Sequence, residues 1–433
     1  MIKNALALKI VAVSLFIVTY ILLLIFPKRR AYVALASALI FLVLGILPWK
    51  DLFKAINWNV ILMLAGTMGL VAIFIESRMP AYLGDLIIKK TPNVKWAIVS
   101  LALFAGLISA FVDNVATVIM IAPIAINVAK KLNKSPVTFI IAIAISSNLQ
   151  GAATLVGDTT SILMGGHTGM TFFDFFVFRG MPGLFFIVQV SAIAATAFLL
   201  IVLRKEKDPI TLMETEKVTD YFPSFLMILL LVLLIVASLI PAVSSFELSS
   251  GIICFSLFII GLARFAFRKK NKKEVAGIFK EIDYQTLLLL CGLFIIIGGL
   301  THAGIITVIS NFLSGISGNV FVMYTILVFA SMFLSAFIDN IPYVATMLPV
   351  VTSIAAAMGC DPFILYFGLL SGATLGGNLT PIGASANIAG LGILRKEGYE
   401  VKALQFMKIS VPFTLIAVLS GYGLIWLFYG GVL

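Results

Sequence analysis

The 433-residue chain is 61% hydrophobic and 11% charged, and its formal net charge is +11. A soluble domain of this composition would expose too much apolar surface to water, so the sequence predicts a multi-pass protein of the plasma (inner) membrane, surrounded by lipid. The basic residues lie in short loops between apolar runs and form no basic domain, which excludes a nucleic-acid partner. The three cysteines are widely spaced, so neither a disulfide framework nor a thiolate metal site is expected.

The first half of the chain contains apolar runs long enough to cross a hydrocarbon core of about 30 Å. They predict helices over 5–26, 31–48, 58–77 and 181–203. Residues 96–131 differ, because a polar stretch at Asp113–Thr117 interrupts them and the second apolar leg, which ends at Ala129, is too short to cross. We interpret 96–131 as a re-entrant hairpin; two spanning helices joined by a polar loop are the alternative.

A discontinuous helix is predicted over 136–167. Glycines and small polar residues interrupt it at Gln150–Asp158, and such backbone is tolerated at membrane depth only inside protein or beside a water-filled cavity. A polar cytoplasmic linker, 206–222, then separates an N-terminal repeat, 1–205, from a C-terminal repeat, 223–433.

The second half repeats this plan. Its predicted elements are helices over 223–240, 248–267, 285–303 and 411–429, a hairpin over 319–358 and a broken helix over 362–394. Ser109–Val115 (SAFVDNV) returns as Ser335–Ile341 (SAFIDNI), and the same offset of 226 residues relates Thr154 to Thr380. Internal repeats of this kind are typical of secondary transporters.

Each half has five predicted crossings and one hairpin, so the second repeat is predicted to be inverted in a ten-crossing protein. Alternate numbering of the loops places every Lys and Arg on one side except Lys3, Lys9, Lys50, Lys54 and Arg179. Because cytoplasmic loops collect basic residues, both termini are predicted outside. The first hairpin then enters from the cytoplasm and the second from the exterior.

The two hairpin tips and the two broken helices are expected to converge at the midplane, where they would bind an ion or substrate. The candidate residues are Asp113, Asn114 and Thr117 at one tip, Asp339 and Asn340 at the other, and Asn148, Thr154, Asp158, Thr159, Thr374, Asn378, Thr380, Ser385 and Asn387 in the unwound segments. No Lys or Arg occurs in 96–129, 136–166 or 319–394, so we expect these acids to have no cationic partner.

A carboxyl group removed from water either takes up a proton or binds a cation, which is the chemistry of H+ or Na+ coupling. Asp113, Asn114, Asp339 and Asn340 are the expected Na+ ligands, and no other metal or cofactor is expected. The alternative is that each Asp only caps the helix after it. Asp158, whose counterpart is Ala384, leaves both interpretations open, and the asparagines either ligate an ion or satisfy freed backbone groups.

The repeated Ser-Ala-Phe-x-Asp-Asn motif and Gly376-Gly-Asn-Leu-Thr-Pro-Ile-Gly-Ala-Ser-Ala-Asn387 resemble the ion transporter superfamily over nearly the whole chain. Within it the chain is similar to the branch with a citrate transporter-like domain, which contains the arsenical pump membrane protein, NhaD-type Na+/H+ antiporters and the P protein. The resemblance implies an all-α fold in which a transport domain moves against a scaffold domain by an elevator mechanism, often within a homodimer.

The leading hypothesis is a secondary active transporter, coupled to H+ or Na+, that exports arsenite or antimonite; neutral arsenous acid needs hydroxyl and amide partners and no cation. A Na+/H+ antiporter is the alternative. A dicarboxylate or citrate transporter stands third, because such members carry Ser-Asn-Thr where this chain has Asp113-Asn114-Val115. The chain lacks the Gly-x-Gly-Asp pattern of an intramembrane aspartyl protease, so no enzyme is expected.

Overall fold

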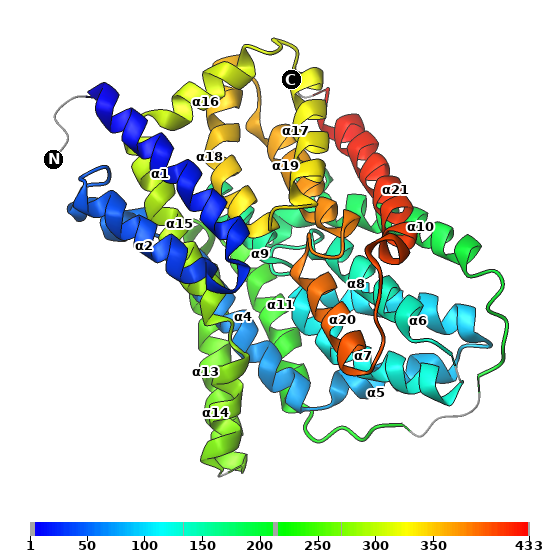
Figure 1. The fold of residues 1–433 in the computed structure, drawn as a ribbon. Coiled ribbons are helices and arrows are strands. Elements are labelled where there is room, and N and C mark those ends of the chain that lie inside the picture. The colour runs from blue at the N-terminus through cyan, green and yellow to red at the C-terminus, as the bar shows by residue number, and fades with distance from the viewer. Residues whose placement is uncertain (1–4, 133, 211–214, 270, 432–433) are drawn as a thin grey trace.

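The computed structural model describes residues 5–132, 134–210, 215–269 and 271–431, and its architecture is almost entirely helical (Figure 1). The first half contains α1 (Ala5–Ile25), α2 (Arg30–Val43), α3 (Leu52–Ala55), α4 (Trp58–Glu76), α5 (Met79–Lys89), α6 (Val94–Ser109), α7 (Asn114–Lys131), α8 (Val137–Gly151), α9 (Thr159–Thr168) and α10 (Leu184–Val202). The second half contains α11 (Phe222–Leu239), α12 (Pro241–Ser244), α13 (Ser249–Lys269), α14 (Lys272–Glu281), α15 (Tyr284–His302), α16 (Ile305–Ser314), α17 (Val320–Ser335), α18 (Asn340–Met358), α19 (Pro362–Gly376), α20 (Ser385–Lys396) and α21 (Ala403–Tyr429).

Short elements connect the long helices. They are the 3-10 turns η1 (Pro27–Arg29), η2 (Trp49–Asp51), η3 (Phe173–Phe175) and η4 (Gly377–Leu379), and an antiparallel hairpin of β1 (Val177–Phe178) and β2 (Met181–Pro182) in which Val177 pairs with Pro182. Figure 1 shows α1 and α2, in blue, on one side of the molecule and α21, in red, on the other, with α13 and α14 extending from one end.

Within the described residues, nine helices are long and apolar enough to cross a membrane. This confirms the predicted helical, multi-pass architecture. The prediction of ten crossings also counts the two broken helices, and it stays a prediction together with the position of the termini.

Three predicted boundaries differ from the structure. The second helix ends at Val43 instead of residue 48, and Gly45 follows it in the left-handed region with φ +71°. The second hairpin leg is an 18-residue helix, α7, because Asp113 caps it and the polar residues that follow belong to its first turn. The argument for a re-entrant hairpin from a short second leg was therefore wrong, although the chain does turn at residues 110–113. The short amphipathic helices α5 and α14 were not predicted.

Both predicted broken helices are present, as α8 followed by α9 and α19 followed by α20. Each unwound segment is attached to the hairpin tip of its own half. Thr154 Oγ1 donates to the Ala110 carbonyl, and Thr380 Oγ1 donates to the Ala336 carbonyl at 2.5 Å. These hydrogen bonds hold the tip and the break together as one unit.

The internal repeat is visible in the helix boundaries. The helices α4 and α15, α6 and α17, α7 and α18, and α9 and α20 each begin 226 residues apart. In both halves a glycine lets a neighbouring backbone approach closely: a Cβ on Gly66 of α4 would lie 2.4 Å from the Cys254 carbonyl carbon of α13, and one on Gly292 of α15 would lie 2.7 Å from that of Ala34 in α2. The pairs α4–α13 and α2–α15 are thus equivalent.

The loops that the charge pattern predicts on one side of the membrane do contact one another. Residues 211–214 of the predicted linker lie outside the described residues, but its first part binds Lys134, whose Nζ lies 3.1 Å from Glu206. Its last part binds α4 and α13: Glu216 pairs with Arg78 at 3.1 Å. Which side is cytoplasmic remains a prediction.

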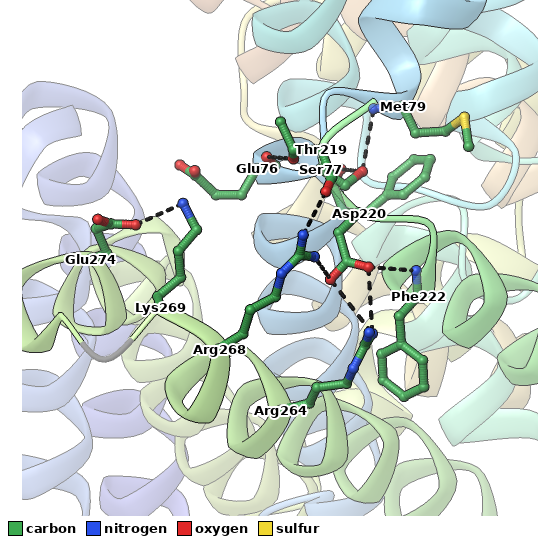
Figure 2. A network of polar contacts seen from close by, with 11 residues as sticks. Glu76, Ser77, Met79, Thr219, Asp220, Phe222, Arg264, Arg268, Lys269 and Glu274 are labelled. Carbon is green, nitrogen blue, oxygen red and sulfur yellow. Dashed lines mark hydrogen bonds and ion pairs between the residues drawn. The ribbon is translucent and has the colours of Figure 1, made fainter. Parts of the chain in front are cut away.

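The end of the linker is held by an ionic network at the end of α13 (Figure 2). Asp220 pairs with Arg268 at 2.6 Å and with Arg264 at 3.4 Å, and Arg268 also donates to the Thr219 carbonyl. Burial raises the pKa of Asp220, but the Phe222 N–H and the two guanidinium groups outweigh burial and hold this pKa below its usual range. The ionised carboxylate therefore fixes the start of α11 to α13.

Candidate functional site

A cavity of about 210 Å³ lies where the two hairpin tips meet α4 and the start of α15. We call it the acid cavity. It is lined by Met68, Val71, Ala72, Ile75, Asp113, Asn114, Val115, Ala116, Ile119, Asp158, Thr159, Glu281, Asp283, Thr286, Asn340, Ile341 and Ser385. Glu281 and Asp283 are exposed, so the cavity opens at the α14–α15 end. Four carboxyl groups and no Lys or Arg are among these lining residues.

Asp113 is the first of the predicted acids in the cavity. It caps α7 with one oxygen, since Oδ2 accepts from Val115 N at 3.0 Å and from Ala116 N at 3.2 Å. The capping interpretation is therefore confirmed, but it accounts for only half of the carboxylate. In the described part of the chain, Oδ1 has no hydrogen-bond donor and no cationic partner, and the residue is partly exposed.

Asp158, only 4% exposed, uses both of its oxygens. Oδ1 accepts from Thr159 N and Oδ2 from Thr160 Oγ1, each at 2.8 Å. It thus caps α9 and is held in place, and it contributes its charge to the cavity. Because Thr160 Oγ1 also lies 2.9 Å from Thr374 Oγ1, Asp158 is linked to the unwound segment of the second half.

Asp339 contradicts the expectation that the acids have no cationic partner. Its Oδ1 accepts from Ile341 N at 3.0 Å, and its Oδ2 lies 2.5 Å from Nη1 of Arg30, the first residue of α2. The expectation failed because it considered only basic residues within the hairpins and broken helices, whereas the fold brings Arg30 in from the other half of the chain. Asp339 does not line the acid cavity; the neighbouring Asn340 does.

The other predicted residues fall into two groups. Asn114, Thr159, Asn340 and Ser385 line the cavity with Asp113 and Asp158. Thr117, Asn148, Thr154, Thr374, Asn378, Thr380 and Asn387 do not line it and are buried behind it. The second group stabilises the site: Asn148 accepts from Asn114 Nδ2 at 2.9 Å and donates to the Thr374 carbonyl at 2.7 Å, so it joins the two halves.

Two buried amide oxygens in this second group, Asn378 Oδ1 and Asn387 Oδ1, have no hydrogen-bond partner in the described structure. Their amide nitrogens do: Asn378 donates to the Ile145 carbonyl, and Asn387 donates to the carbonyls of Gly377 and Thr380. The asparagines therefore satisfy backbone groups at the break, as one of the two interpretations required, and each keeps one oxygen free. Among the described residues no three His, Cys, Asp or Glu side chains are placed to hold a metal ion.

Three polar residues of the cavity were missed: Glu281, Asp283 and Thr286. The internal repeat could have found Asp283, which is the counterpart of Asn57 and caps its helix in the same way. Asp283 Oδ1 accepts from Thr286 N at 3.1 Å, as Asn57 Oδ1 accepts from Val60 N at 3.1 Å. A loop residue 170 positions from Asp113 gives no sign in sequence that it faces the same cavity, whereas the cap itself was readable.

Comparison with known proteins places this architecture. The model of the citrate transporter family, CitMHS, matches residues 20–372, which is most of the chain. The chain belongs to the CitMHS family. This CitMHS protein is 31% identical to the uncharacterized transporter Rv2684 of Mycobacterium tuberculosis, over 97% of the chain and 98% of that protein. It is 25% identical to the human P protein, over 84% of the chain and 53% of the P protein, which confirms the resemblance drawn from the motifs.

Two solved structures share the fold. The Alcanivorax borkumensis YdaH transporter aligns with a TM-score of 0.61 and 13% identity, over 92% of the chain and 97% of YdaH. Neisseria gonorrhoeae MtrF, described as one of a class of antimetabolite efflux pumps, aligns with a TM-score of 0.55 and 14% identity, over 94% of the chain and 83% of MtrF. The CitMHS protein is thus a membrane transporter and not an enzyme, as the sequence predicted.

Proposed function

We propose that this CitMHS protein is a secondary active transporter whose coupling cation, H+ or Na+, binds at Asp113 in the acid cavity. The observation that carries the proposal is the carboxylate of Asp113, which has one oxygen in a hydrogen-bonded cap and the other without a protein donor. An unpaired carboxylate at membrane depth is costly, and a proton or a metal cation is the partner that would offset this cost.

The charge of the cavity indicates which cargo it accepts. Asp158, Glu281 and Asp283 lie near Asp113, and the lining contains no Lys or Arg. An anion such as citrate would meet this negative field without a compensating cation, whereas a neutral or cationic cargo would not be repelled. The lining therefore ranks a citrate or dicarboxylate cargo third, even though the family bears that name.

Arsenite or antimonite is the first cargo to test. Trivalent arsenous acid is neutral, and Asn114, Asn340 and Ser385 supply the amide and hydroxyl groups that would bind its hydroxyls. The second candidate is a Na+/H+ antiporter, in which the cation is itself the cargo; the four carboxyl groups of the lining support it. In this candidate Na+ binds at Asp113 with the amide oxygen of Asn114, and no other cofactor is required.

Transport into proteoliposomes decides between these cargoes. The purified protein is reconstituted with an internal pH-sensitive dye, and NaCl, arsenite, antimonite and citrate are added in turn. An arsenite-dependent pH change supports the exporter, and a Na+-dependent change without arsenite supports the antiporter. A response to citrate alone would overturn both.

Asp113→Asn tests the cation site directly. The amide keeps the size of the side chain and its capping oxygen, so the variant should fold and insert normally, but coupled flux should fall to the background of empty liposomes. Asp361→Asn is the matched control, because Asp361 also caps a helix, α19, yet lies outside the acid cavity. Wild-type flux in Asp113→Asn, or equal losses in both variants, would refute the role of Asp113.

The mechanism that fits this proposal moves the hairpins and broken helices as one unit against the α4–α13 and α2–α15 pairs. The hydrogen bonds between each tip and its own break support the unit, and the inverted repeat, the elevator step and a homodimer are all parts of this proposal. Cysteine pairs placed across the acid cavity, for example at Ala72 and Val115, test it. Crosslinking should trap one conformation and stop flux until a reductant restores it; undiminished flux in the crosslinked protein would exclude the movement.

A further inference from the structure

The two hairpin tips have nearly the same sequence but different partners. Asp113 leaves Oδ1 without a donor in the described structure, whereas Asp339 engages Oδ1 with Ile341 N and Oδ2 with Arg30. We propose that Arg30 is a built-in counter-ion that occupies the acid of the second tip, so that in this conformation a cation binds at the first tip only. This inference rests on the proposed function, because it fixes how many of the two acids are available for the coupling cation.

The position of the pair supports this role. Arg30 begins α2, which packs along α15, while Asp339 lies 309 residues later at the turn between α17 and α18. The side chains are 23% and 9% exposed, so the pair is largely removed from water. A carboxylate in such surroundings is strongly disfavoured without a partner, and the guanidinium supplies a permanent positive charge together with a hydrogen bond. A free cation would have to displace it.

The first half contains no equivalent cation. The glycine contacts described above match Ala34 of α2 with Cys254 of α13, since each lies on the corresponding glycine of its partner helix. Four residues before Ala34 is Arg30, and four residues before Cys254 is Ser250. A neutral serine therefore takes the place of the arginine in the other half. The asymmetry between the tips is thus a property of the sequence and not of one side-chain conformation.

A second contact between the same parts of the molecule provides a control. Tyr20 of α1 donates to the Pro342 carbonyl at 2.7 Å, and its OH lies 2.5 Å from Thr346 Oγ1 in α18. Tyr20→Phe removes these hydrogen bonds from the second hairpin but leaves the charges of Arg30 and Asp339 unchanged. It therefore separates loosening of the hairpin from loss of the counter-ion.

The experiment is labelling of the full-length protein in liposomes with dicyclohexylcarbodiimide, which attacks protonated carboxyl groups in apolar surroundings; peptide mass spectrometry locates the label. In the wild type we expect label at Asp113 and little at Asp339, because a carboxylate paired with a guanidinium holds no proton. In Arg30→Gln, labelling of Asp339 should rise by about tenfold or more, since the carboxyl has lost its partner. Arg30→Lys should restore the wild-type pattern, and Arg29→Gln, which removes a neighbouring charge, should not change it.

Two results would overturn the proposal: Asp339 stays unlabelled in Arg30→Gln, or Tyr20→Phe increases its labelling as much as Arg30→Gln does. Added Na+ or a higher pH should protect Asp113 in the wild type and both acids in Arg30→Gln. The proposed function has a separate readout, because it fails if neither Na+ nor pH protects Asp113. The comparison of Asp339 between wild type and Arg30→Gln remains decisive for the counter-ion in that case.

Discussion

Three aspartates at equivalent or neighbouring positions differ in what binds their oxygens. Asp113 has one free oxygen, Asp158 has two neutral donors and Asp339 has a guanidinium. All three cap helices, so the capping role predicted as an alternative is general and does not identify the functional acid. Sequence predicted the residue types and their helix positions, because caps are local. It could not predict Arg30 or Asp283, because these reach the hairpin tips through the fold.

Asp158→Asn is the prediction that separates field from ligand. The amide still accepts from Thr159 N, and the Thr160 hydroxyl can rotate, so α9 should remain capped. Loss of a nearby negative charge at an effective dielectric constant of ~20 should weaken cation binding by about tenfold, while coupled flux persists at high cation concentration. The measurement is the cation concentration for half-maximal flux in proteoliposomes. An unchanged concentration would show that the Asp158 charge does not act on the site, and complete loss of flux would make Asp158 a direct ligand.

The helices show which sequence patterns carry structural information at this scale. Long apolar runs predicted α1, α4, α10 and α11 closely, and clusters of glycine and small polar residues predicted both breaks. The hairpin legs were less accurate, because polar residues after a cap were interpreted as loop although they continue α7. The helices α5 and α14 are short and carry charged residues, so a search for apolar runs passes over them.

The glycines between equivalent helices should be intolerant of any side chain. Gly66→Ala and Gly292→Ala each place a Cβ against backbone of the neighbouring helix, and overpacking of this kind costs about 1–3 kcal/mol. Gly277→Ala in α14 is the control: no atom lies within 4 Å of its Cβ, so the added helix propensity should stabilise by about 0.5–1 kcal/mol. Thermal unfolding in detergent measures all three. Equal behaviour of Gly66→Ala and Gly277→Ala would contradict the close approach of α4 and α13.

For the whole molecule, the repeat was the most predictive feature of the sequence. The offset of 226 residues, found from two seven-residue motifs, reappears in helix starts and in matched hydrogen bonds. What it did not predict are the departures from symmetry: Asp158 has Ala384 as its counterpart, and Arg30 corresponds to Ser250. These differences lie between residues that the repeat treats as equal, and only their surroundings distinguish them.

The ionic network at the end of the linker joins the halves, and it should depend on pH. The folded protein holds the pKa of Asp220 below its usual value, about 3.9 in an unfolded chain, so its carboxylate stabilises the fold above about pH 4. That contribution is lost as the pH falls through the folded pKa. Since Asp220 is partly exposed, Asp220→Asn should cost about 1 kcal/mol or less at pH 7, and the difference from wild type should vanish in acid.

Thermal unfolding of wild type and Asp220→Asn at pH 7 and at progressively lower pH tests this prediction. Glu274→Gln is the control, because its exposed pair with Lys269 stays within α13 and α14 and should not change the unfolding temperature measurably. A difference for Asp220→Asn that persists at every pH would mean that the aspartate acts through its capping of Phe222 and not through its charge.

The unpaired oxygen of Asp113 has an electrical consequence. In the proposed transporter, a protein that has released its cation bears an uncompensated negative charge within the membrane, and each elementary charge that crosses 100 mV changes the energy by about 2.3 kcal/mol. Asp339 takes no part in this, because Arg30 cancels it. The resting voltage would therefore act on the return of the empty carrier more than on the passage of the loaded one.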